Sequence, residues 1–138
     1  MFRWDKLKKF LGLAHTIYRK LPEVIVTEAT TSLTALQCSG TMINTYGAAD
    51  NMSIELPAAA QGLACTIIAS ATLAKYLHLD PTDNDSIYLD GVTTGDGKYI
   101  GIADLEVGDG IQLTTVKTGA SAYDWVAIVL KGDWALEE

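Results

Sequence analysis

Short apolar runs separated by turn-forming residues fill the chain from residue 23 onward and limit the folds that are open to it. In the clearest run, Met52, Ile54 and Leu56 alternate with Ser53 and Glu55, as a strand with one buried face requires. Turn residues recur about every eight to twelve positions, a spacing typical of β-sandwiches, jelly rolls and barrels. We therefore expect a mainly β fold: an antiparallel β-sandwich that is jelly-roll-like, with one N-terminal amphipathic α-helix.

Two of the predicted strands are apolar on both faces. The stretch 63–69 (LACTIIA) has this character, which predicts a central strand. In 123–130, Trp125 and Ala127 point to one side, and Val126 and Ile128 point to the other. The predicted strands cover residues 24–27, 41–46, 52–56, 63–69, 77–79, 87–89, 99–102, 111–113 and 123–130.

The first twenty-one residues follow a helical period instead. Apolar side chains recur at alternating spacings of three and four, an a/d heptad seam that Phe10 and Ile17 widen. Pro22 ends the predicted helix because it disfavours α geometry at the preceding residue. A helix this short is marginal alone in water, so it must pack on something. The predicted oligomerisation or anchor residues are Trp4, Leu7, Phe10, Leu11, Ala14, Ile17, Tyr18 and Leu21.

Charge divides the chain at the same place. Residues 1–21 contain six basic side chains and one acid, a formal charge of +5, whereas the remainder contains four basic and sixteen acidic side chains, a formal charge of −12. We therefore predict a basic amphipathic helix at 1–21 and an acidic β-sandwich domain at 22–138. The basic residues predicted to meet an acidic partner are Lys6, Lys8, Lys9, Arg19 and Lys20.

This charge pattern narrows the classes of partner. Phosphate contact needs a clustered positive surface, so an acidic domain argues against nucleic acid. The apolar runs are shorter than the roughly 20 residues of a membrane-spanning helix. Residues 10–14 are also too short for the apolar core of a secretory signal. A membrane partner is disfavoured further because an anionic lipid surface would repel the acidic domain.

Four roles remain open for the helix. It can trimerise through its seam, pack against its own domain, dock on another protein through its lysines, or lie on a membrane. At about 1.5 Å per residue, residues 4–21 would span about 27 Å, which is enough to link a domain to a shell.

The sequence provides no convincing catalytic or cofactor site. His15 and His78 have no partner at the spacing of a catalytic triad or a metal site. Cys38 and Cys65 do not form a CxxC motif or a metal spacing. A disulfide between them is an open alternative, but we favour their interpretation as two buried apolar thiols. We therefore predict that the protein is not an enzyme and has no cofactor.

The acidic turn 80–85 (DPTDND) is the best candidate for a metal site. Calcium favours several oxygen ligands from one loop, but this stretch lacks the later ligands of an EF-hand. Pro, Asp and Asn are also common turn residues, and we favour that interpretation over a metal site. The segments 95–97 and 108–110 (both GDG) are likewise predicted to be turns.

The order of several short motifs in the body resembles small β-sandwich modules found in virion proteins of tailed bacteriophages. These motifs are MINTYG (42–47), LPAAAQGL (56–63), LHLDP (77–81), IYLDG (87–91), GDGIQL (108–113), YDWVA (123–127) and GDW (132–134). The resemblance extends from Leu33 to Trp134 and does not include the basic helix.

The resemblance implies a structural role on the surface of a virion. Such modules occur in capsid decoration proteins, head fibres and tail appendages, often as homotrimers. The expected partners are therefore further copies of the chain and other virion proteins, such as the major capsid protein. The alternative is a tail-appendage or receptor-binding module that holds carbohydrate, for which Trp134 or Tyr99 would be the stacking residue.

Overall fold

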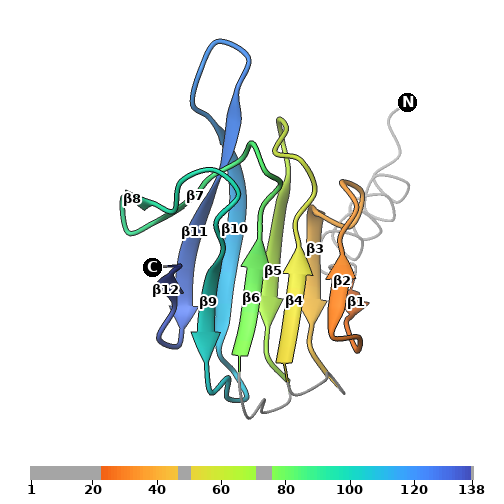
Figure 1. The fold of residues 1–138 in the computed structure, drawn as a ribbon. Helices are drawn as coiled ribbons and strands as arrows, with labels where there is room; N and C mark the ends of the chain where they lie inside the picture. Colours follow the sequence, from red (N-terminus) through yellow and green to blue (C-terminus); the bar gives the residue numbers. More distant parts are fainter. Residues whose placement is uncertain (1–22, 47–50, 71–75, 138) are drawn as a thin grey trace, which may run out of the picture.

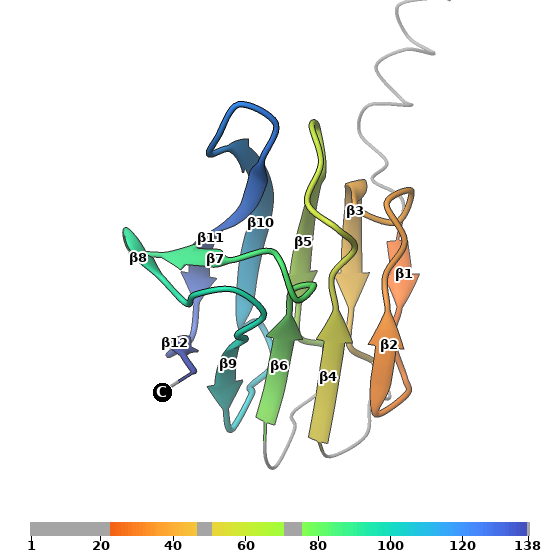
Figure 2. The ribbon, with the colours of Figure 1, turned by 45° about the horizontal axis from the view of Figure 1, so that its top comes forward.

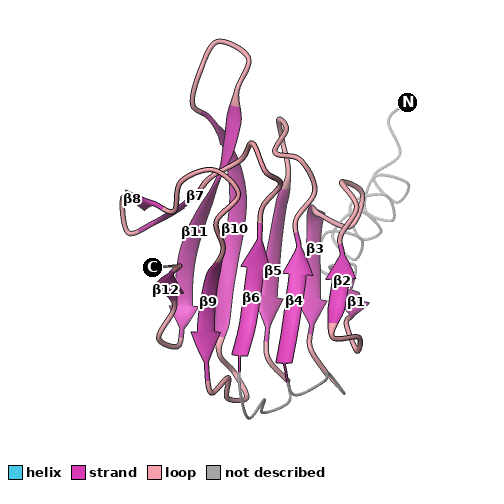
Figure 3. Cartoon of the chain, in the orientation of Figure 1, coloured by secondary structure: helices cyan, strands magenta, loops and turns pink. Residues whose placement is uncertain are grey.

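The computed structural model describes residues 23–46, 51–70 and 76–137, which form two β-sheets joined by loops and turns (Figure 3). The two sheets lie face to face in a sandwich-like arrangement (Figure 1). The predicted mainly β fold is thereby confirmed. The predicted helix, with all of its seam and basic residues, lies outside the described residues. Within the described ranges, no helix has the length and apolarity that a membrane crossing requires.

The larger sheet contains seven strands and the smaller sheet five. In order, the large sheet consists of β1 (Glu23–Ile25), β3 (Ser39–Asn44), β5 (Ala64–Ile68), β10 (Gly110–Lys117), β11 (Tyr123–Lys131), β7 (Ile87–Leu89) and β8 (Val92–Thr93). The small sheet consists of β12 (Ala135–Leu136), β9 (Ile100–Ala103), β6 (Tyr76–Asp80), β4 (Asn51–Glu55) and β2 (Thr30–Ser32).

The first seven strands alternate between the two sheets. β1, β3, β5 and β7 belong to the large sheet, and β2, β4 and β6 belong to the small sheet (Figure 2). After two crossings the chain returns to the sheet it left and runs in the same direction. β3 therefore pairs parallel with β1 and β5, and β4 pairs parallel with β2 and β6. The pairs β6–β9, β9–β12, β5–β10, β10–β11 and β7–β8 are antiparallel, whereas β11 pairs parallel with β7.

The prediction of an antiparallel sandwich is therefore wrong for β1 to β6 where they pair with one another and for the β7–β11 pair. Parallel neighbours need a long crossover connection, and here a strand of the opposite sheet provides it. The alternation of apolar and polar residues is the same for a half-buried strand in either direction, so the sequence pattern carried no information about direction.

The core lies between the sheets and is built from the inward residues of both. Ile43, Ile67, Leu113 and Trp125 come from the large sheet and are almost fully buried. Met52, Ile54, Leu77, Leu79 and Ile100 close the core from the small sheet. The predicted central strand at 63–69 is confirmed, because β5 lies between β3 and β10.

Cys38 and Cys65 are free, buried and in contact with each other within this core. The Cys65 thiol donates a hydrogen bond to Cys38, and this bond, together with burial, raises the pKa of Cys65. Since the thiolate is the reactive form, this thiol is poorly suited to nucleophilic chemistry. The interpretation of both residues as buried apolar thiols is confirmed.

Three short strands were not predicted from the sequence. They are β2, β8 and β12, which have two or three residues each and lie at or beside the sheet edges. Runs this short contain too few residues for an alternating pattern to stand out.

Two leucines provide a matched test of the core. Leu113 is fully buried on β10, whereas Leu36, in the turn before β3, is 82% exposed. Leu113→Ala should lower the free energy of unfolding by about 2–5 kcal/mol because it leaves a cavity. Leu36→Ala should change it by well under half of that amount. Urea unfolding of both variants measures the difference, and equal losses would contradict the assigned core.

Candidate functional site

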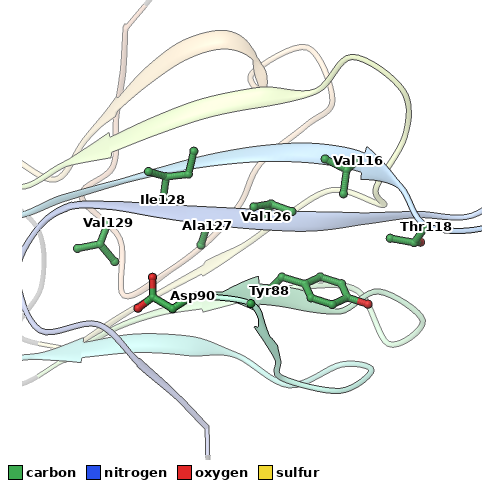
Figure 4. Close-up of a pocket in the computed structure, with 9 residues that line it drawn as sticks. Tyr88, Asp90, Val116, Thr118, Val126, Ala127, Ile128 and Val129 are labelled. Carbon is green, nitrogen blue, oxygen red and sulfur yellow. The ribbon is translucent and has the colours of Figure 1, made fainter.

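An apolar groove lies on the outer face of the large sheet, on the side away from the core. Its volume is about 670 Å³. Tyr88 and Asp90 line one side of the groove, and residues of β11 line the other, as Figure 4 shows. The lining residues are Tyr88, Asp90, Gly91, Val116, Thr118, Val126, Ala127, Ile128 and Val129.

The pairing of β7 with β11 places the two walls of this groove. The strands run parallel in a register that sets Val126 opposite Tyr88 and Ala127 opposite Leu89. β7 then turns back as β8 through Asp90 and Gly91, whose φ angles are 51° and 80°. Positive φ at both central residues is the geometry that Asp-Gly hairpin turns favour. The hairpin therefore borders the groove with a short, tightly turned wall.

Apolar side chains in and beside the groove are unusually exposed. Ile128 and Leu130 on β11 are 50% and 54% exposed, and Val116 on β10 is 37% exposed. Single exposed apolar residues are common, but a cluster around a concave surface is typical of a contact site. The polar groups are few: the Thr118 hydroxyl donates a hydrogen bond to Asp124 at 2.6 Å. This lining is suited to holding an apolar surface and offers no pair of a nucleophile and a base.

The acidic turn that we considered for calcium uses its central carboxylate internally. Asp85 is buried, and its Oδ2 accepts hydrogen bonds from the Ala59 amide and the Thr82 hydroxyl, both at 2.7 Å. The Asp85 amide donates to the Thr82 carbonyl at 2.9 Å, which closes the turn. These bonds agree with the turn interpretation. Across the described ranges, no group of three or more His, Cys, Asp or Glu side chains is placed to hold a metal ion.

The two GDG segments are also turns. Gly95, Gly97 and Gly108 have φ angles of 85°, 69° and 92°, which favour glycine. Asp109 is buried, accepts a hydrogen bond from the Glu106 amide at 2.9 Å, and lies 3.7 Å from the Lys131 ammonium.

His78 lies on the outer face of the small sheet, between two tyrosine rings. Its ring is stacked on Tyr76 at a centroid distance of 4.0 Å and on Tyr99 at 3.9 Å. Gly101 leaves room for this arrangement, because a Cβ atom there would lie 2.8 Å from His78 Cδ2. Burial lowers the pKa of His78, although Asp80 and Glu137 oppose the shift. We call Tyr76, His78 and Tyr99 the aromatic stack.

Trp134, which the sequence offered as a sugar-stacking residue, does not fit that role. Its side chain is 9% exposed and packs in the core. Its indole N–H donates a hydrogen bond to the Lys131 carbonyl at 3.1 Å. A buried ring has no free face for a saccharide, so this part of the prediction is wrong. Tyr99 remains at the surface in the aromatic stack.

Sequence reasoning did not single out the groove or the aromatic stack. For the groove, the sequence did contain a signal. β11 is apolar on both faces, but only one face of a sheet in a two-layer fold can reach the core, so the other apolar face must lie at the surface. For the stack, the sequence places Tyr76 and His78 two residues apart, but Tyr99 arrives from another strand. Its contact with His78 follows from the pairing of β6 with β9.

Comparisons with protein-family models, with curated proteins and with solved structures find no match for this chain.

The lowered pKa of His78 predicts a pH dependence of stability. The folded chain gives up the His78 proton at a lower pH than the unfolded chain, whose histidine titrates near 6.5. Between these two pKa values the unfolded chain binds more protons, so stability falls as the pH falls below about 6.5. Urea unfolding from pH 8 to pH 5.5 measures this loss.

His78→Gln should reduce the pH dependence relative to the parent chain. His15→Gln, which removes the only other histidine, provides the matched control. A His78→Gln variant that keeps the full pH dependence would show that burial of this ring does not cause it.

Proposed function

We propose that the protein is a structural protein of a phage virion, and specifically a capsid decoration or head-fibre protein. In this proposal the N-terminal helix attaches the protein, and the acidic β domain is exposed on the particle surface. The protein assembles as a homotrimer and contacts other virion proteins, such as the major capsid protein. The sandwich-like pair of sheets and the motif order from Leu33 to Trp134 support this role.

The apolar groove is the observation that carries the assembly part of the proposal. Ile128 lines it and Leu130 lies beside it, and both expose about half of their surfaces. Covering the exposed half of each side chain would contribute roughly 1 kcal/mol per residue. Repeated in every copy of a symmetric oligomer, this contribution favours association. We assign the groove to a contact with a second copy of the chain.

The charge distribution supports a separate attachment element. Residues 1–21 carry +5 and the remaining residues −12. Opposite charges of this size favour contact between the basic segment and an acidic surface, and the apolar seam supplies a second means of association. In the proposal, the helix and the groove make separate contacts.

A tail-appendage or carbohydrate-binding module is the alternative. Because Trp134 is buried, this function depends on the exposed tyrosines of the small sheet. Loss of binding to glycans or host cells on Tyr99→Ala would favour it.

Light scattering on the full chain tests the assembly. The parent protein, 14.8 kDa per chain, should have about three times that mass at micromolar concentration. Ile128→Glu should lower the mass because it puts an unpaired charge into the groove contact. Val107→Glu is the matched control, since Val107 is 59% exposed and does not line the groove. A monomeric parent chain, or equal effects of both substitutions, would contradict the groove assignment.

Two variants of the predicted helix separate its possible roles. Leu11→Asp should reduce the oligomer mass measured by light scattering if the seam holds the copies together. Lys8→Glu combined with Lys9→Glu should leave that mass unchanged but weaken incorporation into particles, measured by sedimentation of virions assembled with each variant. If both variants assemble and incorporate like the parent chain, the helix is not the attachment element.

A further inference from the structure

The outer face of the small sheet differs chemically from the groove. The aromatic stack crosses this face from β6 to Tyr99, just before β9, with the His78 ring between the rings of Tyr76 and Tyr99. Each tyrosine has one face against His78. Tyr76 is 38% exposed, and Tyr99 is half-buried. The two ends of the stack therefore offer ring surface to a ligand.

Carboxylates surround the stack. Asp80 follows His78 on β6 and accepts a hydrogen bond from the Ser53 hydroxyl. Glu137, just after β12, accepts a hydrogen bond from the Tyr99 amide at 3.1 Å. Glu55 lies on β4 opposite Asp80. Each of these bonds leaves the carboxylate with further acceptor capacity.

Positive charge is sparse around the same strands. The sequences of β2, β4, β6, β9 and β12 contain no lysine or arginine, and the neighbouring lysines in the sequence are Lys75, before Tyr76, and Lys98, before Tyr99. His78 adds little, because its neutral form is favoured by burial. The face is therefore aromatic and negatively charged at neutral pH.

We infer that this face binds an arginine-bearing basic segment of another protein. A guanidinium group stacks on the open face of a terminal tyrosine ring while Asp80 and Glu137 accept its hydrogen bonds. Arginine is preferred to lysine because its planar group stacks on aromatic rings and pairs with carboxylates through two parallel donors. This assignment is independent of the proposed virion role, which concerns the opposite sheet and the N-terminal helix.

The test uses the full chain and two fluorescent peptides, nona-arginine and nona-lysine, which have equal charge. Binding is followed by fluorescence anisotropy at pH 7.5 and at several salt concentrations. The arginine peptide should bind several-fold more tightly, and the preference should persist at moderate salt, where screening removes most of the purely electrostatic part. Equal binding of the two peptides would overturn the inference, because acidity alone would then account for it.

Matched substitutions locate the site. Tyr99→Leu should lower the affinity for the arginine peptide about five-fold. Tyr46→Leu should leave this affinity unchanged, because Tyr46 is 65% exposed and lies outside the stack. Glu137→Gln should also weaken binding more than Glu28→Gln, which removes the same charge at an exposed position outside the stack. Unfolding curves establish that each variant is folded. Unchanged binding in folded Tyr99→Leu would overturn the inference.

The chain's own arginines provide the last control. Arg3 and Arg19, the only two in the sequence, both fall in residues 1–21, outside the described ranges. The double substitution Arg3→Lys and Arg19→Lys keeps the charge and removes both guanidinium groups. Unchanged affinity for the arginine peptide would support a partner protein. Tighter binding would overturn that choice of partner, since the chain's own arginines would then be occupying the face.

Discussion

Every strand of the two sheets depends on one shared core. Because β1 to β7 lie alternately in the two sheets, each crossing of the chain places apolar residues opposite those of the preceding strand. Neither sheet can bury its inner face without the other, and Ile43, Leu79 and Trp125 reach full burial only in the space between them. The hydrophobic effect therefore acts on both layers together. Loss of packing on one side exposes the inner face of the other.

The outer faces of the two sheets do not have to fill the core, and they differ from each other in chemistry. Most residues that alternate with the core on β11 are aliphatic and border a groove, whereas those on β6, together with Tyr99 just before β9, are aromatic and acidic. A strand carries both sets at once, since successive side chains point to opposite sides. One scaffold can thus present two chemically distinct contact surfaces without altering its interior. We assign these two surfaces to different partners.

The sequence predicted the strands with regular alternation well. Met52, Ile54 and Leu56 are all buried as expected, and so are Leu77 and Leu79. It did not predict strand direction, because a half-buried strand has the same pattern whether its neighbour is parallel or antiparallel. The sites were harder still. The stacking of Tyr99 on His78 requires the β6–β9 register, and the wall at Tyr88 requires the β7–β11 pairing. Both are contacts between segments that no local pattern connects.

The alternating path in the first half of the domain has a consequence for how such chains can change length. Met42 pairs with Thr66 and Ser53 pairs with His78, so equivalent positions recur after one full circuit through both layers. In architectures that stack such circuits, each unit contacts mainly its neighbours. An inserted or deleted circuit of two strands preserves the inward and outward alternation on either side of it. Related proteins could therefore differ in width by whole circuits, while the later strands that close the sandwich stay the same.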